Sequence, residues 1–140
     1  MGRQEELTDV LASFALFADL DAPQVLALVT TFDEVSFASG DRVLRQGMSG
    51  AGFYVIIDGE ATVRVDGAER ATLGRGEFFG EVSILLGQTP VADVVAERPL
   101  RCLVLAPEQV EAFLKSYPSV MFRMLQAQAR RLRAANLWRS

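Results

Sequence analysis

The positions of the glycines constrain the fold of this chain more than any other feature. Apart from Gly2, every glycine lies between residues 40 and 87, where glycines separate short runs of alternating apolar and polar residues. A period of two indicates strands, and recurring glycines indicate tight turns between them. We predict strands near 34–38, 42–46, 52–58, 60–66, 70–73, 77–79, 92–97 and 101–105. Eight short antiparallel strands favour a sandwich or a roll.

Two Asp-Gly pairs predict tight turns between consecutive strands. Asp58-Gly59 follows the alternating run Phe53–Ile57 and precedes the run Ala61–Val65. Asp66-Gly67 comes directly after that second run. Asp-Gly is a strong signal for a two-residue hairpin, because both central residues of the turn need positive φ angles. We therefore expect both pairs to close β-hairpins.

Helices are predicted on both sides of the strands. Residues 5–31 carry apolar side chains at three- and four-residue spacing, with a fresh start at Asp21, which acts as the helix cap. Pro107 begins a short helix, and Pro118 begins a long one that reaches about residue 138. The predicted fold is mainly β with flanking α-helices in one domain. Its parts are the N-terminal helices (5–33), a β-roll (34–106) and the C-terminal helices (107–139).

Composition excludes several classes of protein. Half of the residues are apolar, which excludes a disordered chain. The apolar runs are too short to span a bilayer, and the N-terminus lacks a signal segment, so we expect a cytoplasmic protein with no membrane partner. There is no histidine, and the only cysteine is Cys102. A zinc site and most acid–base mechanisms therefore lack their residues, and we expect no enzyme activity. Cys102 is expected to be a small core residue.

Charge is distributed unevenly along the chain. All eighteen acidic residues lie at or before Glu111, whereas the last eighteen residues contain five arginines and no acid. A basic C-terminal segment indicates either an acidic partner or a solvated helix face near a helix C-terminus. Repulsion between the acidic body and phosphate groups argues against direct binding of nucleic acid, and we expect none.

A candidate anion-binding segment covers residues 79–96. Its first part is Phe79-Gly80-Glu81-Val82-Ser83-Ile84, and it ends in the apolar run Ala92–Ala96. Gly80 is expected to bend the chain before a short helix at 81–86. The first N–H groups of such a helix have no partners within it and attract anions. A second pattern precedes this segment and consists of Val43-Leu44, Gly47, Gly50, Phe53–Ile56 and Gly59.

Both patterns resemble those of the cyclic nucleotide-binding domains, and the predicted order of helices and strands matches that family along essentially the whole chain. The resemblance implies an eight-stranded antiparallel jelly roll, with residues 79–96 as its phosphate-binding cassette. It implies a cyclic nucleotide such as cAMP, or another small anionic ligand, and no cofactor. Glu81 would accept a hydrogen bond from the ribose 2′-OH, or would serve only as a first-turn acid that favours the helix dipole.

The cassette departs from the family pattern at two positions. In a gap-free alignment Pro90 replaces the arginine that grips the phosphate, and Val91 replaces a Ser or Thr. Proline offers neither a charge nor an N–H group. Arg45, Arg75 and Arg98 are each either a replacement for the missing arginine or a solvated surface residue. The expected ligand-binding residues are Gly80, Glu81, Val82, Ser83, Pro90, Val91, Ala92 and Asn136.

The last helix also resembles that of the bacterial catabolite activator family. Ala135 and Asn136 stand where a Thr-Ser pair meets the adenine, so Asn136 either meets a base edge or is an exposed polar residue. An apolar stripe either covers the roll or pairs with a second copy in a homodimer. The stripe consists of Val120, Met121, Met124, Leu125, Gln128, Leu132 and Ala135.

Three functions remain to be distinguished. Because no helix-turn-helix segment follows the last helix, we expect a stand-alone regulatory module that relays ligand binding through its C-terminal helices to a protein partner. The alternative is a degenerate roll that binds no nucleotide and serves as an interaction or dimerisation domain, as Pro90 and Val91 favour. A cupin-type enzyme shares the roll but needs a histidine-rich metal site.

Overall fold

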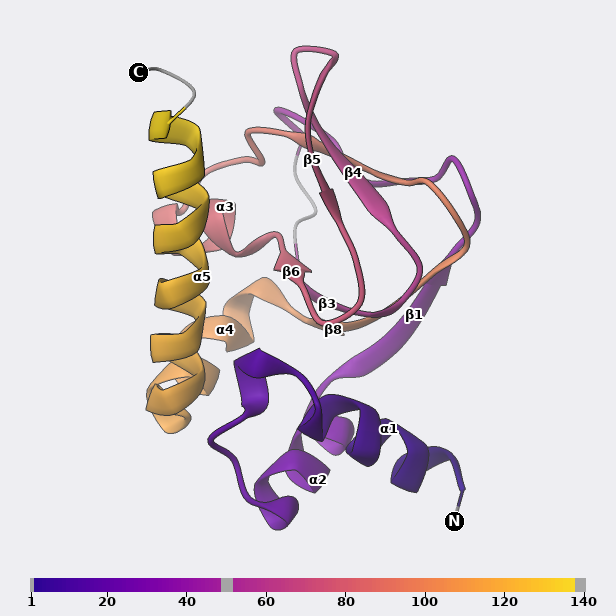
Figure 1. Cartoon of the computed structure of the whole chain (residues 1–140), viewed down its shortest axis with the longest axis vertical. Helices are drawn as coiled ribbons and strands as arrows, with labels where there is room; N and C mark the ends of the chain where they lie inside the picture. Colours follow the sequence, from indigo (N-terminus) through magenta and orange to yellow (C-terminus); the bar gives the residue numbers. More distant parts are fainter. Residues whose placement is uncertain (1, 49–51, 138–140) are drawn as a thin grey trace.

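The computed structural model describes residues 2–48 and 52–137, and it describes the side chains as far as Ala135. Eight strands form two antiparallel four-stranded sheets, which confirms the predicted roll (Figure 1). The first sheet has the order β1 (Asp33–Phe37), β8 (Leu100–Leu105), β3 (Phe53–Asp58) and β6 (Phe78–Phe79). The second has the order β2 (Arg42–Leu44), β7 (Asp93–Ala96), β4 (Ala61–Val65) and β5 (Ala68–Leu73).

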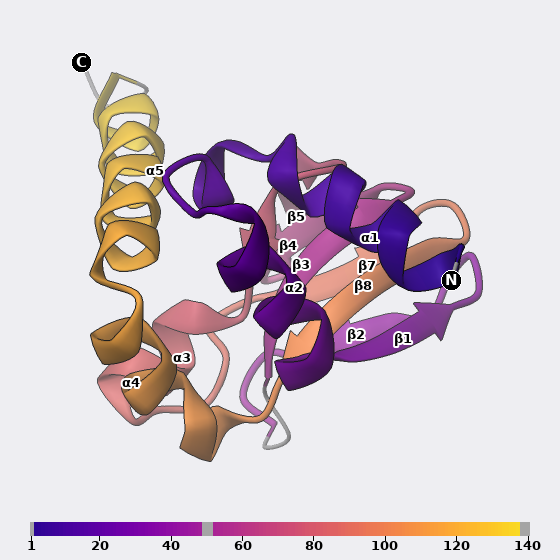
Figure 2. The same cartoon turned by 90° about the horizontal axis from the view of Figure 1, so that it is seen from below.

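Helices flank the roll on two sides. The N-terminal helices lie beneath the sheets in Figure 1 and in front of them in Figure 2, which is seen from below, and α5 stands along one side of the roll in both views. The helical elements are α1 (Arg3–Ala12), the 3-10 turn η1 (Ala15–Phe17), α2 (Ala22–Thr31), α3 (Glu81–Leu86), α4 (Pro107–Ser116) and α5 (Pro118–Leu137). No helix in the described ranges is long and apolar enough to cross a bilayer.

The helix predicted over residues 5–31 is wrong between residues 13 and 21. The chain leaves α1 at Ser13, and Phe14 takes an extended backbone conformation before η1. This break allows Phe14 and Phe17 to turn into the core, where both are buried. The predicted restart is confirmed: the Asp21 carboxylate accepts the Gln24 N–H at 2.9 Å, and the Gln24 side chain accepts the Asp21 N–H at 3.0 Å.

The first sheet separates two hydrophobic cores. Phe53 and Val55 of β3 face the helices, whereas Ile56 of the same strand belongs to the core between the sheets. On β8, Leu103 faces the helices and Cys102 packs inside the roll. Burial raises the pKa of the Cys102 thiol to about 12, which agrees with its expected role as a small core residue.

The two Asp-Gly turns have different roles. Asp66-Gly67 closes the β4–β5 hairpin as predicted, with φ angles of 52° and 80°. The hairpin predicted at Asp58-Gly59 is wrong, because β3 and β4 belong to different sheets and do not pair. A Cβ atom on Gly59 would lie 2.4 Å from the Pro99 carbonyl oxygen. Glycine is needed there because the chain passes close to another backbone segment while it changes sheets.

The N-terminal half of α5 is attached to the rest of the protein by apolar packing and by an ion pair. Val120 and Met124 are buried against the helix-facing side of the first sheet. Arg123 donates two hydrogen bonds to the Asp19 carboxylate, at 2.8 and 3.0 Å. These hydrogen bonds lower the pKa of Asp19 from its ordinary value. Because Asp19 lies in the connection between η1 and α2, the pair joins α5 to the N-terminal helices.

Candidate functional site

The candidate site is built around the bend at Gly80, where the chain passes from β6 into α3. Phe79 is held in place because its ring stacks on Tyr54, with ring centroids 4.9 Å apart. Gly80 then takes a left-handed conformation with φ 92°. A Cβ atom there would lie 1.9 Å from the Gly52 carbonyl oxygen, so no other residue fits. The predicted helix at 81–86 begins directly after this bend.

Glu81 is almost fully buried, with 1% of its surface exposed. Buried carboxylates are rare in proteins unless they are paired. Gln128 of α5 donates a hydrogen bond to Glu81 Oε2 at 3.2 Å, and Arg131 NH1 lies 3.5 Å from the same oxygen. Within the described residues no hydrogen bond is made to Oε1. One oxygen of the buried carboxylate is therefore bound to α5.

Arg131 connects α5 to both sides of the bend. Its NH2 group donates to the Phe78 carbonyl oxygen at 2.8 Å, and its guanidinium lies 4.5 Å from the centre of the Phe78 ring. Phe78 precedes the bend and Glu81 follows it, so a single side chain on α5 fixes the geometry of the start of the cassette.

The role of Arg131 was missed by sequence reasoning, which treated this residue as part of a basic segment. The signal was its spacing: Arg131 follows Gln128 by three residues and Met124 by seven, which places all three on one side of a helix. Only the position of α5 against the cassette shows that this side of the helix meets a buried carboxylate.

Val82 and Ser83, which follow each other in α3, differ in burial. Val82 is exposed, and so are Leu85 and Leu86 on the outer side of the helix. Ser83 is buried, and its hydroxyl donates to the Gly80 carbonyl oxygen at 3.3 Å. The Ser83 hydroxyl therefore supports the bend from within α3.

The second half of the cassette contains the residues that depart from the family pattern. Pro90 is buried, and its carbonyl oxygen accepts the Gly47 N–H at 2.8 Å. Val91 is exposed and Ala92 is half-buried. The Asn136 side chain lies outside the described part of the chain, so its predicted contact with a base stays a prediction.

One of the three arginines considered as replacements at the phosphate position is paired elsewhere. Arg98 lies 3.6 Å from the Glu60 carboxylate. Arg75 lines a cavity of about 530 Å³ beside α1 and β8, and no cassette residue contributes to its walls. Arg45 is exposed. Arg131, which was not among these three, reaches the start of the cassette, where it lies 3.5 Å from the Glu81 carboxylate.

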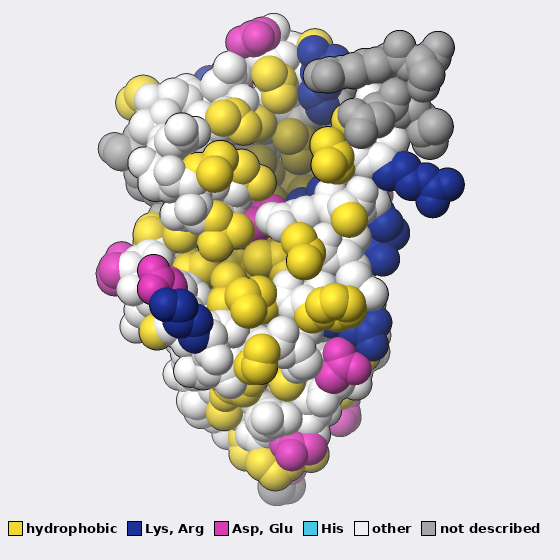
Figure 3. All heavy atoms as spheres, turned by 90° about the vertical axis from the view of Figure 1, so that its left-hand side faces the viewer, with side chains coloured by type: hydrophobic (Ala, Val, Ile, Leu, Met, Phe, Trp, Pro, Cys, Tyr) yellow, Lys and Arg dark blue, Asp and Glu magenta, His cyan; other side chains and the backbone are white. Residues whose placement is uncertain are grey.

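The surface beside α5 is hollowed. Figure 3 shows this face, with a hollow in its upper half that is floored by hydrophobic side chains and has acidic and basic side chains near its edge. A concave apolar surface with a few polar groups suits a small organic ligand. In the ranges that the structure describes, no three Cys, Asp or Glu side chains gather as a metal site would require.

Comparison with known proteins gives one consistent result. The family model described as "Cyclic nucleotide-binding domain" matches residues 34–117. A cGMP-dependent protein kinase from Eimeria tenella is 29% identical over 119 residues, which are 85% of this chain and 12% of the kinase. The chain therefore spans only a small part of that relative.

Two solved bacterial structures are also similar. The Thermus thermophilus Catabolite Activator Protein is 32% identical, with a TM-score of 0.77, over 88% of this chain and 60% of that one. The N-terminal domain of a transcriptional regulator from Streptomyces coelicolor A3(2) is 34% identical, with a TM-score of 0.67. That alignment covers 91% of this chain and 92% of the regulator domain. Both structures share the roll and its flanking helices with this chain.

Proposed function

The chain belongs to the cyclic nucleotide-binding domain family, and on that premise we propose that it is a regulatory, non-catalytic module whose cassette binds a cyclic nucleotide. The observation that carries this proposal is the buried Glu81 carboxylate, which has one oxygen bound to α5 and the other without a partner among the described residues. A ribose 2′-OH is a donor of the kind that Oε1 can accept.

The same carboxylate would couple the ligand to α5. The Glu81 carboxylate contacts Gln128 and Arg131 through Oε2. A ligand hydroxyl bound to Oε1 would change the hydrogen bonding of this carboxylate. Binding therefore shifts the equilibrium between two positions of α5, and the size of the shift is set by the difference in ligand affinity between them. The partner that responds to this shift would contact α5 or the outer side of α3.

Affinity for the phosphate is expected to be low, because Pro90 supplies no charge. The ligand phosphate would rely on backbone N–H groups at the start of α3 and on the positive end of the helix dipole. Losing the charged partner of a buried anion costs about 3–5 kcal/mol, which corresponds to two to three and a half orders of magnitude in affinity.

We predict that cAMP at millimolar concentration raises the melting temperature of the native chain, and that Pro90→Arg binds cAMP at least about 100-fold more tightly. The new guanidinium would pair with the phosphate at the position where the family has its arginine. The measurement is a thermal-shift titration with cAMP and cGMP, in which a ligand at 100 times its dissociation constant stabilises the fold by about 2.7 kcal/mol.

Gln88→Arg is the matched control, because it adds the same charge to an exposed position of the same loop. Its affinity should stay within about threefold of the native chain. If only Pro90→Arg responds to nucleotide, the native cassette has lost this ligand and the interaction-domain alternative is favoured. If neither protein responds, the nucleotide proposal is wrong.

We further propose that α5 pairs with α5 of a second copy. Phe122, Leu125, Ala129 and Leu132 follow one another at intervals of three, four and three residues, and all four are exposed. This spacing is that of the a and d positions of a coiled coil. The stripe predicted from the sequence mixed two sides of the helix: Val120 and Met124 are buried in the protein, whereas Leu125 and Leu132 are 59% and 63% exposed.

We expect the native chain to be a dimer in solution and Leu125→Glu to be a monomer, because two like charges would face each other in the middle of the apolar seam. Sedimentation velocity over a range of concentrations measures the difference. Gln126→Glu places the same charge on the neighbouring residue, outside the seam, and should remain dimeric. A native chain that stays monomeric at 100 μM would contradict the pairing.

A further inference from the structure

A second cavity, of about 360 Å³, lies between α5 and the N-terminal part of the chain. Its walls come from three separate elements: η1, the turn that leads into β6, and residues 123–134 of α5. Glu81 does not line it, so this cavity is distinct from the hydroxyl-binding position at the cassette. Its volume is in the range of small-molecule sites in proteins.

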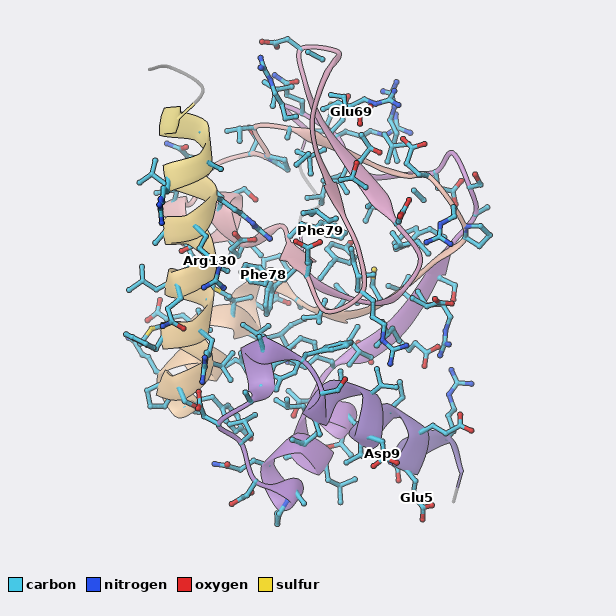
Figure 4. All side chains as sticks on the ribbon, viewed as in Figure 1. Glu5, Asp9, Glu69, Phe78, Phe79 and Arg130 are labelled. Carbon is cyan, nitrogen blue, oxygen red and sulfur yellow. The ribbon has the colours of Figure 1, made fainter. Side chains whose placement is uncertain are left out.

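Three arginines of α5 line this cavity, and two of them are fixed by partners. Arg123 is held by its paired hydrogen bonds to Asp19, and Arg131 is held by Phe78 and Glu81. Arg130 makes no ion pair or hydrogen bond with any residue in the described ranges. Figure 4 shows Arg130 on α5 beside Phe78 of β6, and both residues line the cavity. The cavity therefore contains one guanidinium that has no hydrogen-bond or ion-pair partner among the residues that the structure describes.

The remaining walls are mostly apolar. Leu16 and Phe78 supply large hydrophobic side chains, and Ala127 and Ala134 leave room along the helix. Glu77 is the one acidic residue of the lining, and its carboxylate accepts the Gly74 N–H at 2.8 Å. The Glu77 charge disfavours a ligand with several negative charges. A single anionic group on an apolar body fits both the Arg130 guanidinium and the apolar walls.

We propose that this cavity is a second ligand site, which binds a small organic monoanion such as an aromatic carboxylate or sulfonate through Arg130. The ligand would contact α5, η1 and Phe78 at the same time. Because these elements are separate, a ligand that bridges them favours the arrangement in which α5 is packed against the roll. The proposal does not rest on the proposed nucleotide site, because Glu81 does not line the cavity.

The test is a titration of the ¹⁵N-labelled chain with 2-naphthoate, followed by amide chemical shifts. We expect saturable changes at Ala15, Gly76 and Ala127, which line the cavity, and none at Gly87, beyond the end of α3. Arg130→Gln should weaken binding at least about tenfold, because it removes the charged donor. Arg133→Gln is the matched control: it removes the same charge from the same helix at a residue that does not line the cavity.

Neutral 2-naphthamide provides the second comparison, since it has the same ring system without the charge. It should bind at least about tenfold more weakly than 2-naphthoate. The proposal is overturned if naphthamide binds equally well, if Arg133→Gln weakens binding as much as Arg130→Gln, or if the changes cluster at Leu125 and Leu132. The amide spectrum of each variant shows at the same time whether it is folded.

Discussion

Gly80→Ala is expected to destabilise the protein by at least about 4 kcal/mol, a large share of the roughly 5–15 kcal/mol by which native proteins are stable. The added Cβ atom would lie 1.9 Å from the Gly52 carbonyl oxygen. That oxygen belongs to the backbone, so rotation of a side chain cannot relieve the contact. The φ angle of 92° adds strain of about 1–3 kcal/mol for any residue with a Cβ atom.

Gly67→Ala separates these two contributions. Gly67 also has a positive φ angle, 80°, but no atom lies within 4 Å of the position that its Cβ would take. We expect this variant to lose about 1–2 kcal/mol, from backbone strain alone. Urea denaturation of the native chain, Gly80→Ala and Gly67→Ala measures the free energy of unfolding of each. Equal losses in the two variants would show that the close approach to Gly52 does not decide the choice of glycine at position 80.

Arg131→Ala is expected to cost about 3 kcal/mol of unfolding free energy and to release the C-terminal half of α5. It removes the charge 3.5 Å from the buried Glu81 carboxylate and the hydrogen bond to the Phe78 carbonyl oxygen. Removing one partner of a buried pair is costly because the other charge remains buried. Arg131 itself is partly exposed, which places the expected loss at the lower end of the range for such pairs.

A double-mutant cycle with Glu81→Gln tests whether this pair carries the effect. We expect Arg131→Ala to cost less by about 1–2 kcal/mol in the Glu81→Gln background, where no buried charge is left unpaired. Arg133→Ala serves as the control on the same helix and should change stability by less than about 0.5 kcal/mol. A coupling energy close to zero would mean that Arg131 stabilises α5 only through Phe78, and the relay from Glu81 to α5 would lose its support.

The helix α5 has three sides with different neighbours. One side contains Met124, Gln128 and Arg131 and packs against the core and the cassette. A second side contains the exposed seam of Phe122, Leu125, Ala129 and Leu132. The third contains Arg130 and faces the second cavity. The three proposed events, which are nucleotide binding, pairing with a second copy and binding of an organic anion, would therefore all act on the position of α5.

Local chemistry in the sequence determined most of the secondary structure. The alternation of apolar and polar residues predicted all eight strands, because one side of each strand must be buried. The helix starts marked by Asp21, Pro107 and Pro118 were also predicted, since each depends on a residue's own backbone preferences or hydrogen bonds. The pattern around Gly80 located the cassette and the short helix that follows it.

Tertiary structure alone decided which elements meet. Asp58-Gly59 has the sequence of a hairpin turn, but in the structure it connects a strand of one sheet to a strand of the other. Arg131 has the sequence context of a solvated residue, but the docking of α5 brought it to a carboxylate fifty residues earlier in the chain. Turns and strands follow from contacts between neighbouring residues. The partner of a buried charge depends on how distant segments pack, and no local pattern encodes it.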